Sequence, residues 1–425
     1  MQLTVRIPKV SVFIWLLTII MTLSFYLPGF DIGPLSAKIY ASCGLFISAI
    51  IAAALSGRPL IKLPLGKKIL IFWILLILCK VITLYHNGYN LRGIGISLLK
   101  NDILSIFMFT AIIFYVRQRK DMGFLINVLI ALILLSIFIG FMQWMGQEWA
   151  WRLLYKLNPD LSTYFDELPQ AELIPGLSSH AFTFGYYLST LGPLSLPLIL
   201  QPRVKILNLL KILAVIIGVL ILQQRSAIIA FAISVLLFVW GVKRYLKGRF
   251  ISRIFLVFIL IAGSYGLVKL CVYGLGPHVR YDLYRMKIKR SDPRIEMARS
   301  AIELALNYPL TGVPANKFVL GADLKPEAAH NIFINTFYHY GIFALGFVFM
   351  ILFYFFKLSE KVWRNAWKTG DYLLLGLVLG LLGYNLNSLF HNASFVTGDY
   401  MVWWIVALLI ASEQISKKEA AQNVK

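Results

Sequence analysis

Segment 276–328 contains a dense group of basic residues between two long apolar stretches. Guanidinium and ammonium groups at this density attract anions, and the planar fork of arginine matches the oxygens of phosphate and pyrophosphate. The segment also contains carboxylates, so a solvated face of paired charges is the alternative to an anion site. The basic residues are Arg280, Arg285, Lys287, Lys289, Arg290, Arg294 and Arg299, and the acidic residues are Asp282, Asp292, Glu296 and Glu303.

Arg294 lies in the first turn of a predicted helix. Asp292 followed by Pro293 is typical of a helix start, with Asp as the N-cap and Pro at the first helical position. The apolar positions 295, 298, 302 and 305/306 predict one apolar face, suited to the membrane surface. The helix dipole disfavours a cation in the first turn, whereas an anion bound there would be stabilised by free N–H groups and by Arg294.

Two further candidates lie where apolar stretches begin. Gln223-Gln224-Arg225-Ser226 separates two such stretches and puts Arg225 at the mouth of a helix, where it can bind an anion or reach lipid headgroups. His330-Asn331 opens another stretch, and Asn335 and His339 continue it as a polar stripe at helical spacing. Because histidine can act as a base near neutral pH, His330 is the candidate base, with substrate binding as its alternative role.

Other polar residues near the same helix ends are interpreted mainly as hydrogen bonds within a helix bundle, although His180 could join the site. The sequence has no paired-carboxylate metal motif on the outer side and no P-loop, and its three cysteines lack metal-ligand spacing. We therefore predict neither a metal nor a cofactor. Nucleic acid is not an expected partner, because the basic segment is predicted to lie on the outer side of the membrane. The polar residues interpreted mainly as forming hydrogen bonds within the bundle are Asn385, Asn387, His391, Asn392 and Asp399.

The elements that must position these residues are membrane-spanning helices. Of the 425 residues, 59% are hydrophobic and 14% are charged, against about 25% charged in a soluble domain. Apolar stretches match the thickness of a bilayer, in which helices satisfy their own backbone. We predict an all-α polytopic bundle of about twelve helices, forming one integral membrane domain over 1–425. The predicted spans are approximately 10–27, 38–56, 68–85, 100–116, 122–142, 180–200, 206–222, 226–242, 253–275, 331–356, 371–390 and 397–413.

Clustered Lys and Arg occupy alternate connections between these spans. By the positive-inside rule these connections and both termini are cytoplasmic, and the clusters are expected to contact anionic membrane lipids. Two outer connections are long: 143–179, and 276–328 between the ninth and tenth spans, for which we predict amphipathic helices. Positive charge in 276–328 opposes the rule, which favours an anionic ligand there.

Three segments resemble, in the same order, motifs of the O-antigen ligase and O-antigen polymerase superfamily. Residues 224–230 (QRSAIIA) resemble its Thr/Gln-Arg-Ser/Ala-hydrophobic segment. Residues 294–312, from Arg294 through Asn-Tyr-Pro to Gly312, resemble its Arg-helix-(Asn)-Pro-x-x-Gly segment, although Val313-Pro314 stands where the family usually has another glycine. Residues 330–344 (HNIFINTFYHYGIFA) resemble its His-Asn-x-hydrophobic segment, which ends in Gly-hydrophobic-x-Gly/Ala.

This resemblance implies a metal-independent membrane glycosyltransferase without a cofactor. It implies a glycan donor linked to undecaprenyl pyrophosphate, and an active site on the periplasmic side of a bacterial inner membrane. We expect Arg225 and Arg294 to bind the pyrophosphate, where arginines stabilise the charge that develops on the leaving group. His330 would accept the proton of the acceptor hydroxyl or orient that hydroxyl. Further binding residues would be Arg280, Arg299, Asn331 and His180.

Ligase and polymerase share these motifs and differ in the acceptor, which is a lipid A–core sugar for a ligase and another lipid-linked glycan for a polymerase. We favour the ligase, because the chain is compact and the basic segment suits a phosphorylated lipid A–core. A transporter or flippase is a third interpretation, since twelve spans are common there. Transporters usually bind at the bilayer midplane between related halves, and this sequence has no such halves.

Overall fold

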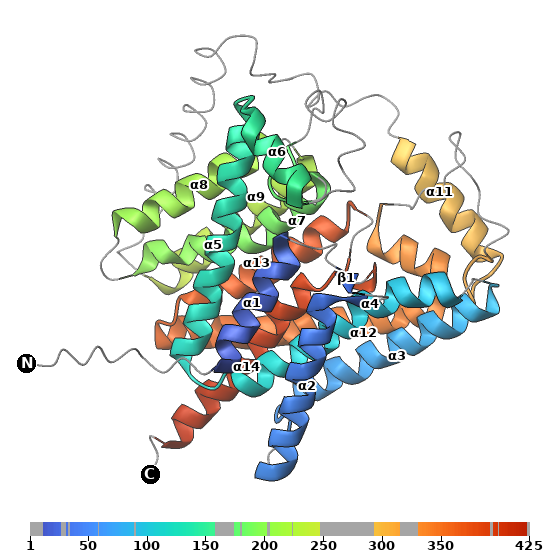
Figure 1. Cartoon of the computed structure of the whole chain (residues 1–425), viewed down its shortest axis with the longest axis horizontal. Coiled ribbons are helices and arrows are strands. Elements are labelled where there is room, and N and C mark those ends of the chain that lie inside the picture. Colours follow the sequence, from blue (N-terminus) through green and yellow to red (C-terminus); the bar gives the residue numbers. More distant parts are fainter. Residues whose placement is uncertain are drawn as a thin grey trace, which may run out of the picture.

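The structure, a computed structural model, is helical in nearly all of the residues it describes (Figure 1). These are residues 12–26, 31–32, 35–57, 59–88, 91–157, 174–178, 181–201, 205–222, 224–246, 293–314, 330–391, 394–397 and 399–422. Two-residue strands β1 (Asp31–Ile32) and β2 (Leu35–Ser36) pair antiparallel. The predicted helical class is therefore confirmed, with this small pairing as an addition.

The helices follow one another with short connections over most of the described chain. The first group is α1 (Val12–Tyr26), α2 (Ala37–Ser56), α3 (Pro64–His86), α4 (Leu91–Tyr115), α5 (Arg119–Trp144) and α6 (Glu148–Leu157). The second is α7 (Ala181–Leu191), the 3₁₀ helix η3 (Gly192–Leu200), α8 (Ile206–Leu222), α9 (Arg225–Tyr245) and α11 (Pro293–Leu306). The last is α12 (Ile332–Thr369), α13 (Leu373–Ser388), the short 3₁₀ turn η7 (Phe395–Thr397) and α14 (Met401–Gln422).

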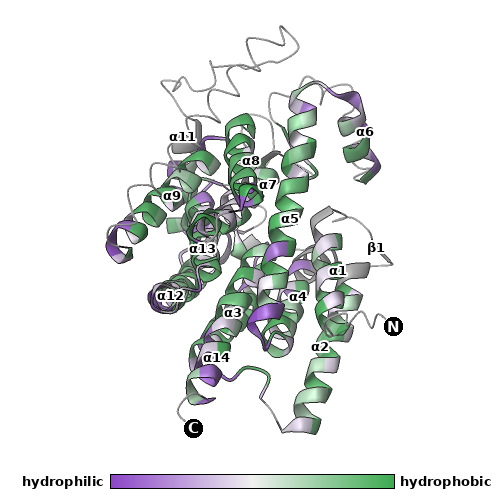
Figure 2. Cartoon of the chain, turned by 90° about the vertical axis from the view of Figure 1, so that its left-hand side faces the viewer, coloured by the Kyte–Doolittle hydropathy of each residue, from purple (hydrophilic) through white to green (hydrophobic). Residues whose placement is uncertain are grey.

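Helices occupy every predicted span except 253–275, which lies outside the described residues. Five of the described helices are long and apolar enough to cross a bilayer, namely α2 from Ile39, α3, α5, α9 and α12. Shorter apolar helices lie in α1, α4, α8 and α13. Hydrophobic residues make up most of the length of the helices, and hydrophilic residues gather at helix ends such as those of α9 and α14 (Figure 2). The chain is a multi-pass membrane protein, and the count of twelve spans stays a prediction.

Close packing of α13 against α7 and η3 fixes the centre of the second half. A Cβ atom on Gly380 would lie 2.3 Å from the Thr190 carbonyl oxygen, and one on Gly383 would lie 2.0 Å from that of Ser189. Such small residues let helix backbones approach closely in a membrane, where interhelical contact replaces the hydrophobic effect. Asn387 adds a hydrogen bond of 3.3 Å to the Ser189 hydroxyl, which agrees with the predicted bundle role of this residue.

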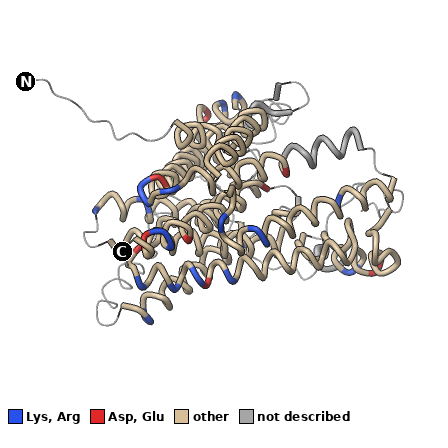
Figure 3. The backbone as a smooth tube through the Cα atoms, turned by 90° about the horizontal axis from the view of Figure 1, so that it is seen from below, with Lys and Arg blue, Asp and Glu red and all other residues tan. Residues whose placement is uncertain are grey.

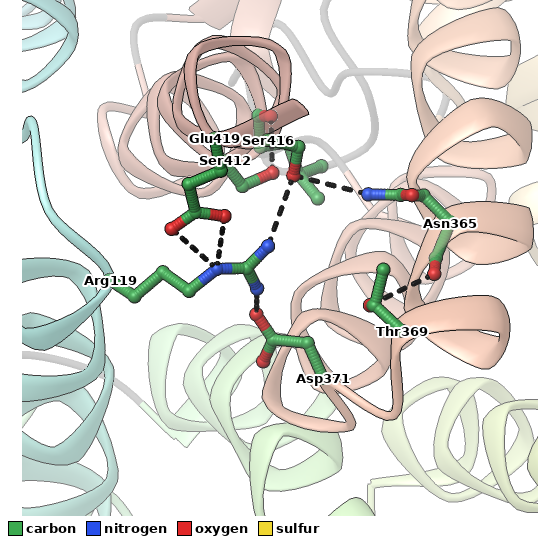
Figure 4. Close-up of polar contacts among 8 residues, drawn as sticks. Arg119, Asn365, Thr369, Asp371, Ser412, Ser416 and Glu419 are labelled. Carbon is green, nitrogen blue, oxygen red and sulfur yellow. Dashed lines mark hydrogen bonds and ion pairs between the residues drawn. The ribbon is translucent and has the colours of Figure 1, made fainter. Parts of the chain in front are cut away.

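A group of ion pairs ties three helices together at one end of the bundle (Figure 4). Arg119, at the start of α5, donates to the Asp371 carboxylate between α12 and α13 and to Glu419 of α14, at 2.8 Å. It also approaches the Ser416 hydroxyl, at 3.4 Å. Several Lys and Arg residues lie near this end, where the C-terminus is found (Figure 3). The opposite ends of α12 and α13 carry the candidate site.

Candidate functional site

His330 lies directly before α12 in a backbone conformation that is rare for a residue with a side chain, with φ 47°. Asn331 caps the helix: its Oδ1 accepts hydrogen bonds from the N–H groups of Phe333 (2.9 Å) and Ile334 (3.2 Å). Its Nδ2 donates to the Leu389 carbonyl at 3.1 Å. The cap satisfies N–H groups that lack a helical partner and joins the start of α12 to the end of α13. Asn331 therefore fixes the place of His330, and its binding role stays a prediction.

His391, which follows α13, connects two of the predicted motifs. It is buried, and its Nε2 forms a hydrogen bond with Nε2 of Gln224, the N-cap residue of α9. Its ring centroid lies 6.2 Å from that of His330, with the rings at 74°. The structure therefore brings Gln224 and His330 to one site through His391, which the sequence indicated mainly as a residue that hydrogen-bonds within the bundle.

α7 completes the wall around His391. The ring of Phe182 lies 5.1 Å from the His391 ring, and the ring of Tyr186 lies 5.9 Å from it. Between them, Gly185 lets Gln224 approach, because a Cβ atom there would lie 1.6 Å from Oε1 of Gln224. Gln224 also donates to the Ser226 hydroxyl at 3.2 Å. A glycine at position 185 is thus a packing requirement of the site.

Arg225 is the first residue of α9 and is exposed. The side chain of the preceding Gln224 makes no capping hydrogen bond to the helix. An uncapped helix start together with a guanidinium group is an arrangement that favours an anion. The geometry is compatible with the predicted phosphate role of Arg225, which stays a prediction.

α11 begins at Pro293, as the Asp-Pro sequence predicts, although Asp292 itself lies outside the described residues. Ala298, Ala301 and Ala305 belong to a cluster with Tyr338 of α12, and the packing of α11 on α12 is close. Ile302 and Leu306 remain exposed. The predicted apolar face is therefore divided, with small residues against α12 and larger ones on the surface.

The predicted basic ligands are placed in part. Arg294 is the second residue of α11, but its side chain is not described. Arg299 is exposed and forms an ion pair with Glu303 at 2.8 Å, a hydrogen bond that raises the pKa of the guanidinium. This pairing matches the alternative of a solvated charged face for Arg299. His180 and Arg280 lie outside the described residues.

α12 is broken within the stretch predicted as one continuous span. At Gly341 the backbone has φ 77° and ψ −173°, which separates 332–340 from the rest of the helix. The chain after α11 lies in the break: Val313 N–H donates to the Tyr338 carbonyl, and Ile342 N–H donates to the Pro309 carbonyl, both at 2.8 Å. The turn itself is made by Gly312, with φ 68°, so the departure at Val313-Pro314 does not prevent it.

Glycine is required on both sides of this contact. A Cβ atom on Gly312 would lie 2.5 Å from the His339 carbonyl carbon and oxygen, and one on Gly341 would lie 2.2 Å from the Leu310 carbonyl oxygen. Both residues also have positive φ, which disfavours side chains. Gly312 of the second motif therefore packs against the backbone of the third motif, and Gly341 of the third motif packs against the backbone of the second.

Sequence reasoning did not single out α3, which contacts this region. Lys80 is a buried polar residue of this helix, and Asn87 is its buried C-cap residue. Their spacing of i and i+7, and a lysine inside an apolar stretch, are signals that could have marked a buried polar face. Among the described residues no cluster of three or more metal-ligating side chains is found.

The long apolar helices are those of a multi-pass membrane protein. Its candidate active site lies at one end of the bundle, where the broken helix α12 places His330. Residues 210–349 match the family model described as O-antigen ligase, and this match supports membership of the O-antigen ligase superfamily. The match contains all three motifs, from Arg225 to Gly341, and supports a membrane enzyme of glycosyltransferase type that acts on lipid-linked glycans. No curated protein matches the chain.

Proposed function

We propose that this protein is an O-antigen ligase that transfers a glycan from undecaprenyl pyrophosphate to a lipid A–core acceptor at the periplasmic face of the inner membrane. The observation that carries the proposal is the meeting of Gln224, His391 and His330 at the starts of α9 and α12. It joins two motifs that are separated by about a hundred residues and that both lie within the family match.

In the proposed reaction the acceptor hydroxyl oxygen attacks the anomeric carbon of the glycan. The bond from that carbon to the pyrophosphate oxygen breaks, and undecaprenyl pyrophosphate leaves with the electron pair. His330 takes or orients the hydroxyl proton, while Arg225 and Arg294 stabilise charge on the phosphate oxygens. Because the positive guanidinium groups stabilise this negative charge, the proposed step needs no divalent metal.

The choice of ligase over polymerase rests on the sequence, because the basic segment 276–328 suits a phosphorylated lipid A–core. The exposed Ile302 and Leu306 of α11 suit the surface of a bilayer, which holds either acceptor. A polymerase would use the same donor site with a second lipid-linked glycan.

Reconstitution of the purified protein in detergent tests the proposal. The undecaprenyl-pyrophosphate glycan would be supplied with lipid A–core or with a second lipid-linked glycan, each with and without a chelator. We expect glycosylated lipid A–core, formed equally well with chelator. Elongation of the lipid-linked glycan alone would indicate a polymerase. No product with either acceptor, together with movement of the lipid in sealed vesicles, would indicate a transporter.

Lipopolysaccharide gels of a deletion strain give an independent reading. Loss of a ligase leaves the core bare while lipid-linked polymer accumulates. Loss of a polymerase leaves the core capped with a single repeat. The second pattern would contradict the proposed acceptor and keep the donor site.

A further inference from the structure

One face of α3 lies against the broken part of α12 (Figure 1). Its buried residues Lys80, Thr83 and Leu84 recur at i, i+3 and i+4, which places them on one side of the helix. The buried C-cap residue Asn87 follows at i+7. The side chains at the two ends of this face contact the two segments of backbone that meet at the break. Asn87 contacts the inserted segment 309–313, and Lys80 contacts the residue before Gly341.

Asn87 holds the inserted segment through its amide. It is 7% exposed, and its Nδ2 donates to the Thr311 carbonyl at 2.8 Å, with Val313 and Gly312 carbonyls at 3.4 and 3.5 Å. These carbonyls belong to a turn, so they are not paired in the hydrogen-bond pattern of a helix. Since a buried carbonyl without a donor costs about 1–3 kcal/mol, the amide of Asn87 is an anchor for this turn.

Lys80 holds the helix side of the break. Its Nζ lies 6.0 Å from the ring centroid of Tyr340, the residue before Gly341. Asp102 of α4 fixes the lysine by an ion pair of 2.9 Å, with side chains that are 2% and 4% exposed. A cation this well buried over an aromatic ring adds a directional contact. The pair therefore orients Lys80 toward the end of the short helix 332–340.

The position of His330 depends on the angle at this break. The segment Ile332–Tyr340 is about 13 Å long at about 1.5 Å per residue. A tilt of about 10° at Gly341 would move its far end, which carries His330, by about 2 Å by lever geometry. Misplacement of a catalytic group by about 1 Å can lower a rate about 100-fold. A glycine break that is not braced would allow such a tilt.

We propose that Asn87 and Lys80 of α3 are positioning residues that brace the broken helix and thereby hold His330 in place for glycan transfer. This inference rests on the proposed function. Neither residue lies within the family match or within the three motifs. Asn87 acts on the inserted turn and Lys80 on Tyr340, so both sides of the break are contacted from α3 and its C-cap residue.

The test compares Asn87→Leu, which keeps the size of the side chain and removes its donor, with Thr83→Val as the matched control. Thr83 lies on the same buried face, but among the described residues its hydroxyl bonds only to the Cys79 and Lys80 carbonyls of its own helix. With purified full-length protein, undecaprenyl-pyrophosphate glycan and lipid A–core, we expect Asn87→Leu to lower kcat about 10- to 100-fold. The KM for the donor should stay within about threefold, and Thr83→Val should stay within about twofold of the wild type. Wild-type kcat for Asn87→Leu, or an equal loss for Thr83→Val, would overturn the inference.

Two further measurements separate this inference from the proposed function. In the His330→Ala background, Asn87→Leu should cause no further loss, because it acts through His330; losses that multiply would refute the brace. Hydrogen exchange needs no activity: the amides of Val313 and Ile342 should exchange faster in Asn87→Leu, while those of α5 should not change. Unchanged exchange at both amides would overturn the brace, whatever the activity of the protein. Inactivity on both acceptors would instead reject the proposed function and leave the brace standing.

Discussion

The Tyr338 carbonyl and the Ile342 N–H group are four residues apart, the spacing of a helical hydrogen bond, yet each is bonded to the segment that follows α11. Val313 donates to Tyr338 and Pro309 accepts from Ile342. A break in a membrane helix leaves polar backbone groups that lipid cannot satisfy, and here another part of the chain supplies both partners. Pro309 of the second motif and Val313, which follows that motif, therefore supply the hydrogen-bond partners missing at the break in α12.

Replacement of Gly341 by alanine tests this interlock. The Cβ atom would enter the space of the Leu310 carbonyl, and φ of 77° is unfavourable for alanine. We expect a lower melting temperature, from a loss of at least about 1–3 kcal/mol of stability, together with weaker transfer. Gly346→Ala is the control, because it lies in the same helix with nothing within 4 Å of its Cβ. Similar melting temperatures for the two variants would argue against the interlock.

Loss of the proposed catalytic groups should abolish transfer without loss of protein. His330→Ala, Arg225→Ala and Arg294→Ala are each expected to lower the rate about 100- to 1000-fold, because one preorganised contact to developing charge is removed. The measurement is transfer by purified protein, with membrane levels followed by immunoblot. Arg152→Ala is a matched control, since this exposed arginine pairs with Glu148 at i and i+4 and such pairs contribute little. Near-normal surface polysaccharide in all three variants would reject the site.

The buried pair of Lys80 and Asp102 should show strong coupling. Either single replacement, Lys80→Met or Asp102→Leu, leaves an uncompensated charge and should cost about 3–5 kcal/mol of stability. The double variant, which removes both charges, should recover most of that loss in the melting temperature of the purified protein. Losses that simply add would mean that the two side chains are not coupled.

The contact between Gln224 and His391 can be tested from the neighbouring helix. Gly185→Ala would push the Gln224 amide away from its place, since that amide is the atom group nearest to the added methyl. We expect transfer to fall by about tenfold or more, as a displaced group near the reacting atoms costs rate, while the protein stays folded. Gly44→Ala, which has open space around its Cβ, should leave transfer unchanged. Full activity of Gly185→Ala would show that the contact is dispensable.

The sequence was sufficient for features with a local cause. Apolar length placed the helices, and the Asp-Pro pair placed the start of α11, because each depends on a few consecutive residues. The His330 and Arg225 positions at helix starts followed from the same reasoning. The sidedness of these ends relative to the membrane, and the roles of Arg280, Arg294 and His180, remain predictions.

Features that depend on distant partners were beyond that reasoning. Asn87 bonds a carbonyl 224 residues away, and Gln224 meets a histidine 167 residues away. Periodicity reports which face of a helix is buried, but it does not report which helix covers that face. The break at Gly341 was missed for the same reason: an apolar stretch predicts a continuous helix, and the turn that replaces its hydrogen bonds comes from another segment.

The ion pairs of Arg119 have a consequence for the order of assembly. The partners Asp371 and Glu419 follow Arg119 by 252 and 300 residues. Since synthesis proceeds from the N-terminus, Arg119 cannot form these ion pairs until Asp371 and then Glu419 of α14 have been made. A late-made helix, α14, therefore joins the start of α5 to the later part of the described chain.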